Sequence, residues 1–130
     1  MFTQILSPRF CETDALGHIN NTVLPVWFEM GREPVFRIFN PVMDVQKWQL
    51  IIARIDVEFL KQLHFGEDVE IRTVLEKVGN SSMYILHEAW QRGQLCARGK
   101  AVLIHYDYES EKATPIPDDI RQQLMEHLEK

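Results

Sequence analysis

The residues best suited to chemistry lie together in the segment 12–21, which reads Glu-Thr-Asp-Ala-Leu-Gly-His-Ile-Asn-Asn and precedes a strongly apolar stretch. If that stretch forms a helix, its first turn offers free backbone N–H groups and the positive end of the helix dipole. A carboxylate such as Asp14 can activate water or attack a carbonyl, and free N–H groups can hold the resulting oxyanion. The segment therefore predicts half of an acyl-transfer site.

The apolar stretch predicts a helix that starts beside this segment. Its apolar residues cover nearly all sides of a helical wheel, which is typical of a buried helix. Because Pro25 is tolerated only in a first turn, the helix should begin near Asn21 or Thr22, either of which is a good N-cap. Pro34 should kink or interrupt the helix near Glu33.

The remaining chain favours strands, because its apolar residues recur with a period of two. The expected elements are a first strand over 3–11, the helix, a loop over 40–49, strands over 51–59, 69–76, 83–92 and 95–106, and a C-terminal helix over 118–129. Consecutive strands with short turns indicate an antiparallel sheet. Small residues on one face of the last strand, such as Gly99, would let a helix lie close to it. One helix cannot cover both faces of such a sheet, so we expect a second subunit to complete the burial.

Length and composition bound the class of protein. The 130 residues suggest one domain over 1–130, and the net charge of -5 speaks against a general nucleic-acid binder. Cys11 and Cys96 do not make a disulfide framework, and no spacing of cysteines or histidines indicates a zinc site. The sequence contains neither a signal peptide nor an apolar run of ~20 residues, so we expect no membrane span and a cytoplasmic protein.

Residues 14–21 match the Asp-x-x-Gly-His-(Val/Ile)-Asn-Asn signature of hot-dog-fold acyl-CoA thioesterases, so the chain resembles the 4-hydroxybenzoyl-CoA thioesterase-like family. Further matches lie at Glu29 and Arg32, at 66–68 and at 79–82, so the resemblance covers nearly the whole chain. It implies an α+β hot-dog fold, in which a five-stranded antiparallel sheet wraps a long central helix, with a C-terminal helix added. Many relatives carry a tyrosine at Leu24 and a helix-favouring residue in place of the following proline.

The resemblance assigns roles within the motif. Asp14 would activate water or act as the nucleophile, and the backbone N–H of Asn21 would hold the oxyanion. The alternatives are that Asp14 is a loop residue of an Asx turn and that Asn21 is only an N-cap. His18 is given a supporting role, either structural or as a proton carrier. Asn20 would hydrogen-bond the substrate or simply close the loop.

Outside the motif, Glu29 is the reserve catalytic acid. Because a buried carboxylate needs a partner, we expect it to form a structural pair with Arg32. Leu24 and Phe59 are expected to contact the acyl group. Arg98 and Lys100 share a strand face and could bind the phosphates of CoA across a subunit boundary, or form an ordinary solvated face; Lys61 and Arg92 are weaker candidates, and the other histidines are expected to be structural or on the surface.

The resemblance therefore implies an acyl-CoA thioesterase that uses no metal and no redox cofactor, binds acyl-CoA and assembles as a homodimer or homotetramer. One alternative is a non-catalytic hot-dog protein that binds acyl-CoA or acyl carrier protein. Another is a dehydratase of the same fold, but those enzymes carry a different histidine-containing signature that this sequence lacks.

Overall fold

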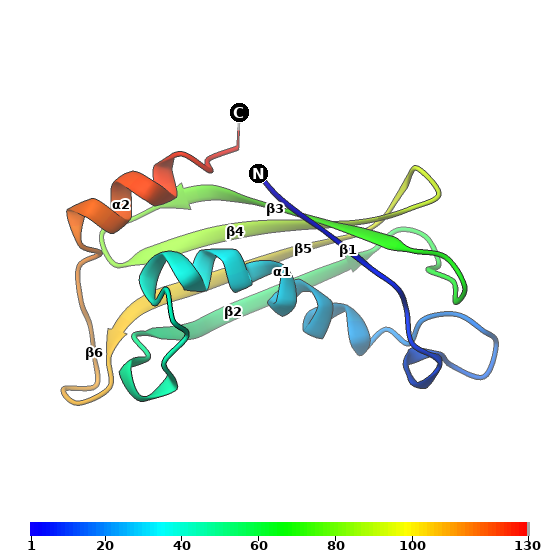
Figure 1. Ribbon diagram of the computed structural model, residues 1–130, viewed down its shortest axis with the longest axis horizontal. Helices are drawn as coiled ribbons and strands as arrows, with labels where there is room; N and C mark the ends of the chain where they lie inside the picture. Colours follow the sequence, from blue (N-terminus) through cyan, green and yellow to red (C-terminus); the bar gives the residue numbers. More distant parts are fainter. Residues whose placement is uncertain (130) are drawn as a thin grey trace.

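The computed structural model describes residues 1–129 and contains one sheet with two α-helices (Figure 1). In chain order the elements are β1 (Phe2–Leu6), the short 3-10 helix η1 (Phe10–Glu12), α1 (Val23–Phe39), η2 (Val45–Lys47), β2 (Leu50–Phe59), β3 (Val69–Val78), β4 (Ser82–Gln91), β5 (Gln94–Asp107), β6 (Lys112–Ala113) and α2 (Asp118–Met125). No helix within this part of the chain is long and apolar enough to cross a membrane.

The sheet is antiparallel, with the strand order β1-β3-β4-β5-β2, and β6 pairs with β5. Helix α1 lies along one face of this curled sheet, and α2 lies near the end where β3 meets β4 (Figure 1). The expected α+β architecture of a long helix, a wrapping antiparallel sheet and a C-terminal helix is confirmed. The sixth strand was not expected, because two residues are too few to produce a period-two pattern.

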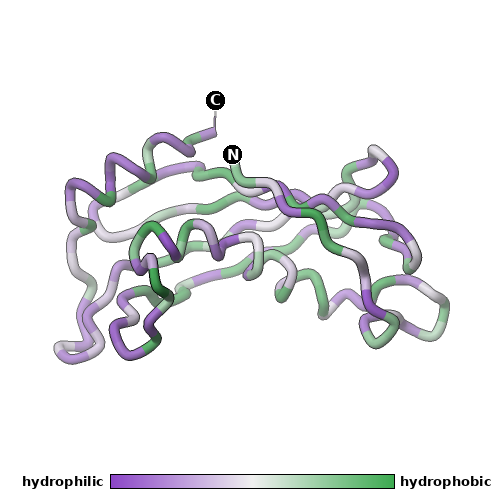
Figure 2. The backbone as a smooth tube through the Cα atoms, in the orientation of Figure 1, coloured by the Kyte–Doolittle hydropathy of each residue, from purple (hydrophilic) through white to green (hydrophobic). Residues whose placement is uncertain are grey.

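Helix α1 packs closely on the sheet because the strand below it carries small residues. Leu24, Trp27 and Phe28 are buried on this side, and the first half of the helix is largely hydrophobic (Figure 2). A Cβ atom added to Gly99 of β5 would lie 2.5 Å from the ring of Phe28. The expectation that small residues of this strand admit a helix is therefore confirmed.

Pro34 does not interrupt α1, so that part of the prediction near Glu33 is wrong. A proline in a helix interior removes the N–H that would bond the carbonyl four residues earlier. Here that carbonyl belongs to Met30, and it accepts a hydrogen bond of 3.1 Å from Nε2 of Gln4 in β1. The side chain of β1 supplies the donor that the helix itself lacks.

The first strand and the last helix are shorter than expected. The strand ends at Leu6, before Pro8, and the chain then forms η1. Helix α2 ends at Met125 because the tail pairs with β3 instead: the N–H of Leu75 bonds the carbonyl of His127, and its carbonyl accepts the N–H of Glu129. The tail thus extends the contacts of the sheet.

One side of α1 is open, so the prediction of a helix buried all round is wrong for the isolated chain. Val26 is 61% exposed and Glu29 is exposed too. Strand β2, expected to be half-buried, is exposed along most of its length because it forms an edge of the sheet. Burial of this seam by a second subunit stays a prediction.

Candidate active site

The loop before α1 folds around the carboxylate of Asp14. Oδ1 accepts hydrogen bonds from the N–H groups of Leu16 (2.7 Å) and His18 (3.1 Å), and the N–H of Asp14 bonds the carbonyl of His18 at 2.7 Å. Gly17 has a φ of +79°, which favours glycine there. Asp14 is thus an Asx-turn residue, yet its side chain remains 37% exposed and Oδ2 lies 4.0 Å from Nδ1 of His18. Oδ1 holds the loop, and Oδ2 accepts no hydrogen bond among the described residues.

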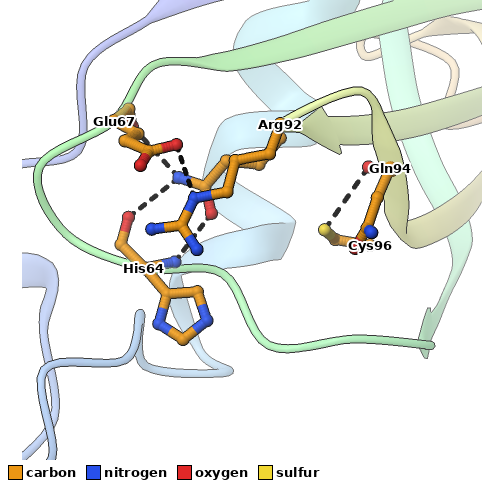
Figure 3. A network of polar contacts seen from close by, with 6 residues as sticks. His64, Glu67, Arg92, Gln94 and Cys96 are labelled. Carbon is orange, nitrogen blue, oxygen red and sulfur yellow. Dashed lines mark hydrogen bonds and ion pairs between the residues drawn. The ribbon is translucent and has the colours of Figure 1, made fainter.

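A second loop supports the first. The N–H of Ile19 bonds the carbonyl of Leu63 at 2.8 Å, and the rings of His18 and His64 meet edge to face with centroids 5.1 Å apart. The buried amide of Gln91 accepts from the N–H of His64 and donates to its carbonyl. Figure 3 shows this loop around His64 and the ion pair between Glu67 and Arg92. The supporting position of His18 is therefore set by contacts to the neighbouring loop.

The ion pair of this second loop joins Glu67 to Arg92 in the β4–β5 turn, with an N–O distance of 2.6 Å (Figure 3). The hydrogen bond from Arg92 holds the pKa of the Glu67 carboxyl below its usual value. Both side chains are about half exposed. An exposed ion pair of this kind contributes little to the stability of the fold. The pair engages Arg92 with the protein itself.

A buried hydrogen bond ties the loop to the helix, and the sequence did not reveal it. Oε2 of Glu12 accepts from Nε1 of Trp27 at 2.8 Å, and Oε1 accepts from the N–H of Arg9 at 2.7 Å. Burial raises the pKa of the Glu12 carboxyl, but these hydrogen bonds outweigh burial and leave it below the usual value. The signal for this contact in the sequence was limited to an acidic residue in the segment that precedes an apolar helix.

The start of α1 leaves a backbone N–H free. Oδ1 of Asn20 accepts from both the N–H and the hydroxyl of Thr22, each at 3.0 Å, so Asn20 closes the loop. Thr22 occupies the N-cap position as expected, but its side chain makes no capping hydrogen bond. Among the described residues, the N–H of the exposed Asn21 has no acceptor. The group predicted to hold an oxyanion is available.

A pocket of about 430 Å³ opens at this point, between the start of α1 and the segment that follows β2. Asn21, Leu24 and Phe59 line it, so the structure brings together three of the predicted site residues. Lys61, a weaker candidate for phosphate binding, lines it as well. Asp14 lies on the loop that leads to the pocket and is not part of its wall.

The predicted pair of Glu29 and Arg32 is wrong. Glu29 is exposed, and the two side chains are not within ion-pair distance among the described residues. Arg32 is buried against the sheet instead, with Nη1 3.3 Å from Nε2 of His87. The two residues separate because one points out of the helix into the open seam and the other points under it.

His87 is a structural residue, which is one of the two roles expected for the histidines outside the motif. Its ring stacks on Phe28 with centroids 5.0 Å apart, and Nδ1 lies 2.9 Å from the hydroxyl of Thr73. Because guanidinium only donates, Nε2 accepts from Arg32 and the proton sits on Nδ1. Burial, together with the charge of Arg32, lowers the pKa of His87 to about 3. The imidazole is therefore neutral at physiological pH.

Arg98 and Lys100 share a strand face, as predicted, but this face points away from α1. Gly99, between them in sequence, is the residue that points toward Phe28 of the helix. Arg98 pairs with Glu58 at 2.9 Å, and Lys100 pairs with Glu76 at 2.8 Å. Within one subunit these cations are therefore not brought to the pocket.

No group of three or more histidine, cysteine or acidic side chains within the described residues could hold a metal ion. Cys11 is exposed and Cys96 is buried, and both are free thiols.

Comparison with known proteins gives consistent matches. A family profile described as the thioesterase-like superfamily matches residues 8–124. The structure of a predicted thioesterase from Bacillus stearothermophilus is 42% identical, superimposes with a TM-score of 0.97, and the match covers 99% of this chain and 97% of that one. A thioesterase from Thermus thermophilus, solved with coenzyme A and Zn, is 26% identical with a TM-score of 0.84, covering 94% and 95% of the two chains.

One curated relative is the protein YsmA of Bacillus subtilis (strain 168). It is 29% identical over 126 residues, which cover 95% of this chain and 85% of YsmA. The matches therefore extend over nearly all of the chain in both sequence and structure.

Proposed function

The chain belongs to the thioesterase-like superfamily, and from this premise we propose that it is an acyl-CoA thioesterase whose catalytic groups are Asp14 and the N–H of Asn21. Family membership makes it a thioester hydrolase of the hot-dog fold. The observation that carries the assignment of residues is that Asn21, whose N–H is free among the described residues, lines a pocket beside the Asp14 loop. The CoA bound by the Thermus thermophilus relative supports the thiol part of the substrate.

In the proposed reaction, the carboxylate of Asp14 takes a proton from water while the water oxygen bonds to the thioester carbonyl carbon. The carbonyl oxygen becomes an oxyanion and accepts the hydrogen bond of the Asn21 N–H, aided by the dipole of α1. The C–S bond then breaks, and the CoA sulfur leaves with the proton returned by Asp14. Direct attack by Asp14 would give an anhydride that water then hydrolyses.

The neighbouring residues have positioning roles in this proposal. His18 and Asn20 hold the loop and the helix start, because their bonds to Asp14 and Thr22 fix both reacting groups. Glu29 lies eight residues beyond Asn21, or about 12 Å along the helix, which is too far for a carboxylate to share the same carbonyl. Asp14 is therefore the acid that we assign.

Residues that line the pocket would bind both the acyl group and the CoA part of the substrate. Leu24 and Phe59 would contact the start of the acyl group, and Lys61 is the cation best placed for the phosphates of CoA. Arg98 and Lys100 could take part only across a subunit boundary, since their own carboxylate partners occupy them in one subunit.

We also propose that the protein is a homodimer or homotetramer. Strand β2 is an edge strand whose apolar side chains are exposed, at 48% for Ile52 and 50% for Ile55. An exposed apolar edge is a template for pairing with another copy. A second subunit there would also cover the open side of α1.

The test of the function is the release of free thiol from a panel of acyl-CoA thioesters, with free acid measured as the second product. We expect turnover for at least one aliphatic or aromatic acyl group. Saturable binding of acyl-CoA with no product would contradict hydrolysis and identify a non-catalytic binding protein instead.

A further inference from the structure

Glu12 is a buried acid that joins two elements of the site, although the proposed reaction does not use it. It is 8% exposed. Oε1 accepts from the N–H of Arg9 at 2.7 Å, and Oε2 accepts from Nε1 of Trp27 at 2.8 Å. Trp27 lies in the second turn of α1 and is itself buried. Among the described residues, this is the one side-chain hydrogen bond between residues 9–19 and α1.

The backbone of Glu12 closes the base of the loop that carries Asp14. Its carbonyl accepts from the N–H of Asn20 at 2.8 Å. The carbonyl of Asn20 in turn accepts from the N–H of Val23, the first residue of α1, at 3.0 Å. Asp14 therefore lies within the loop, and the N–H of Asn21 follows directly after the loop's base.

The two proposed reacting groups therefore belong to different bodies. The N–H of Asn21 belongs to the start of the helix, whereas Asp14 lies on an exposed loop. Both must keep a fixed distance from the thioester carbonyl, because a displacement of about 1 Å can cost 10²-fold in rate. A loop held at its base alone could pivot about the helix start. The buried bond from Glu12 to Trp27 adds a second point of attachment.

We propose that Glu12 is a positioning residue, whose carboxylate holds the Asp14 loop against α1 so that Asp14 and the Asn21 N–H keep the separation that hydrolysis requires. This inference rests on the proposed function, since it takes these two groups as the reacting ones. Although burial raises the pKa of the Glu12 carboxyl, the hydrogen bonds from Arg9 and Trp27 leave it below its usual value. The carboxylate is therefore ionised at neutral pH and offers an acceptor to each donor.

The test variant is Glu12→Gln, which keeps the shape of the side chain but replaces one acceptor oxygen by an NH2 donor. That donor must face the N–H of either Arg9 or Trp27, so one of the two bonds is lost. Thiol release from the best acyl-CoA substrate should show a kcat lower by about 10–10²-fold. KM should change by less than about threefold, because Leu24 and Phe59 still line the pocket.

Trp27→Phe removes the donor on the other side of the same bond and should lower kcat in the same way. In the double variant, the introduced amide can turn its NH2 toward a ring that donates nothing and keep its oxygen on the N–H of Arg9. Two effects that arise from one contact are not additive, so the double variant should be no slower than the slower single variant. Losses that simply multiply would contradict a shared link.

Asn40→Ala is the matched control for a general loss of stability. Asn40 is a buried polar residue that closes a loop at the other end of α1, through two bonds to the backbone of Asp44. Its substitution should lower the Tm but leave kcat unchanged, whereas an activity that merely follows stability would fall here too. Unchanged kcat in both Glu12→Gln and Trp27→Phe would overturn the inference and leave the proposed function intact.

Hydrogen exchange tests the link between loop and helix without a substrate. In Glu12→Gln, the N–H groups of His18 and Asn20, which close the loop, should exchange at least about tenfold faster than in the wild type. Asn40→Ala should show no such change. Equal exchange rates in Glu12→Gln and the wild type would overturn the inference. Faster exchange in Glu12→Gln, with no thiol release by the wild type from any acyl-CoA, would support the link and contradict the proposed function instead.

Discussion

Asp14 and Asn21 could be identified from the sequence because their relationship is local. Residues 14–21 carry both the carboxylate and the free N–H in one loop, and Pro25 limits where the following helix begins. The contacts of Glu12 with Trp27 and of Arg32 with His87 could not be identified in this way, because they join residues that are 15 and 55 positions apart in the sequence. Such pairs depend on the packing of α1 on the sheet rather than on any motif.

The bond between Glu12 and Trp27 should matter for stability. Trp27→Phe removes the indole donor and leaves a buried carboxylate oxygen without its partner, so the free energy of unfolding should fall by about 1–3 kcal/mol. Urea denaturation measures the change. The matched control is Trp90→Phe, because Trp90 also donates to a carboxylate, Glu88, but is only partly buried. Equal losses in the two variants would contradict the special role of the Glu12 bond.

The buried neutral His87 predicts how stability depends on pH. Its pKa is about 3 in the folded protein, against ~6.5 in the unfolded chain, so between these values only the unfolded chain takes up the proton. The free energy of unfolding should therefore fall as pH drops below ~6.5, by up to about 1.4 kcal/mol per pH unit from this residue.

His87→Gln isolates this contribution, because glutamine can accept from Arg32 and donate to Thr73 without titrating. Denaturation curves at several pH values between ~5 and ~7 should be flatter for the variant than for the wild type. Parallel pH profiles for the two proteins would show that His87 does not remain neutral in the folded state.

Among the elements, strands β3 to β5 follow the period-two pattern of burial closely, because one face of each strand is covered and the other is more exposed. The misjudged elements are those whose ends depend on partners. Pro34 stays inside α1 because Gln4 of a distant strand bonds the carbonyl of Met30. Helix α2 stops early because the tail pairs with Leu75. Neither partner could be inferred from local sequence.

The close contact between α1 and β5 should not tolerate a larger residue at Gly99. Gly99→Ala places a methyl group within 2.5 Å of the ring of Phe28, so the helix must shift and stability should fall by about 1–3 kcal/mol. Thermal or urea denaturation measures the loss. In a Phe28→Leu background, which vacates ring volume, the same substitution should cost less. Strictly additive losses would indicate that the two residues do not share one contact.

For the whole molecule, the sequence correctly predicted the α+β architecture but not which surfaces stay open. A buried helix and a half-buried strand were expected where the single subunit exposes one side of α1 and most of β2. Apolar periodicity reports only that a surface is to be covered; it does not distinguish cover by the same chain from cover by a second copy. The assembly is therefore the natural place to look for the missing contacts.

The solution mass should be a multiple of the 15.3 kDa of one chain, corresponding to a dimer or a tetramer. Ile52→Lys places a charge on the exposed face of β2 and should shift the mass toward the monomer. Ile5→Lys is the matched control, because Ile5 is a similarly exposed isoleucine on β1, the opposite edge of the sheet. Light scattering coupled to size exclusion gives the masses. A stable wild-type monomer would contradict the proposed assembly.

The central claim, that Asp14 is the catalytic carboxylate, is tested most directly by thiol release from the best acyl-CoA substrate in Asp14→Asn. Asparagine keeps the oxygen that accepts from Leu16 and His18, so the loop should persist while the base is lost. Asp44→Asn is the control, because Asp44 makes a similar bond to the N–H of Gln46 at η2, away from the site. We expect kcat to fall by about 10²–10⁴-fold in Asp14→Asn only. Full turnover by Asp14→Asn would contradict the account.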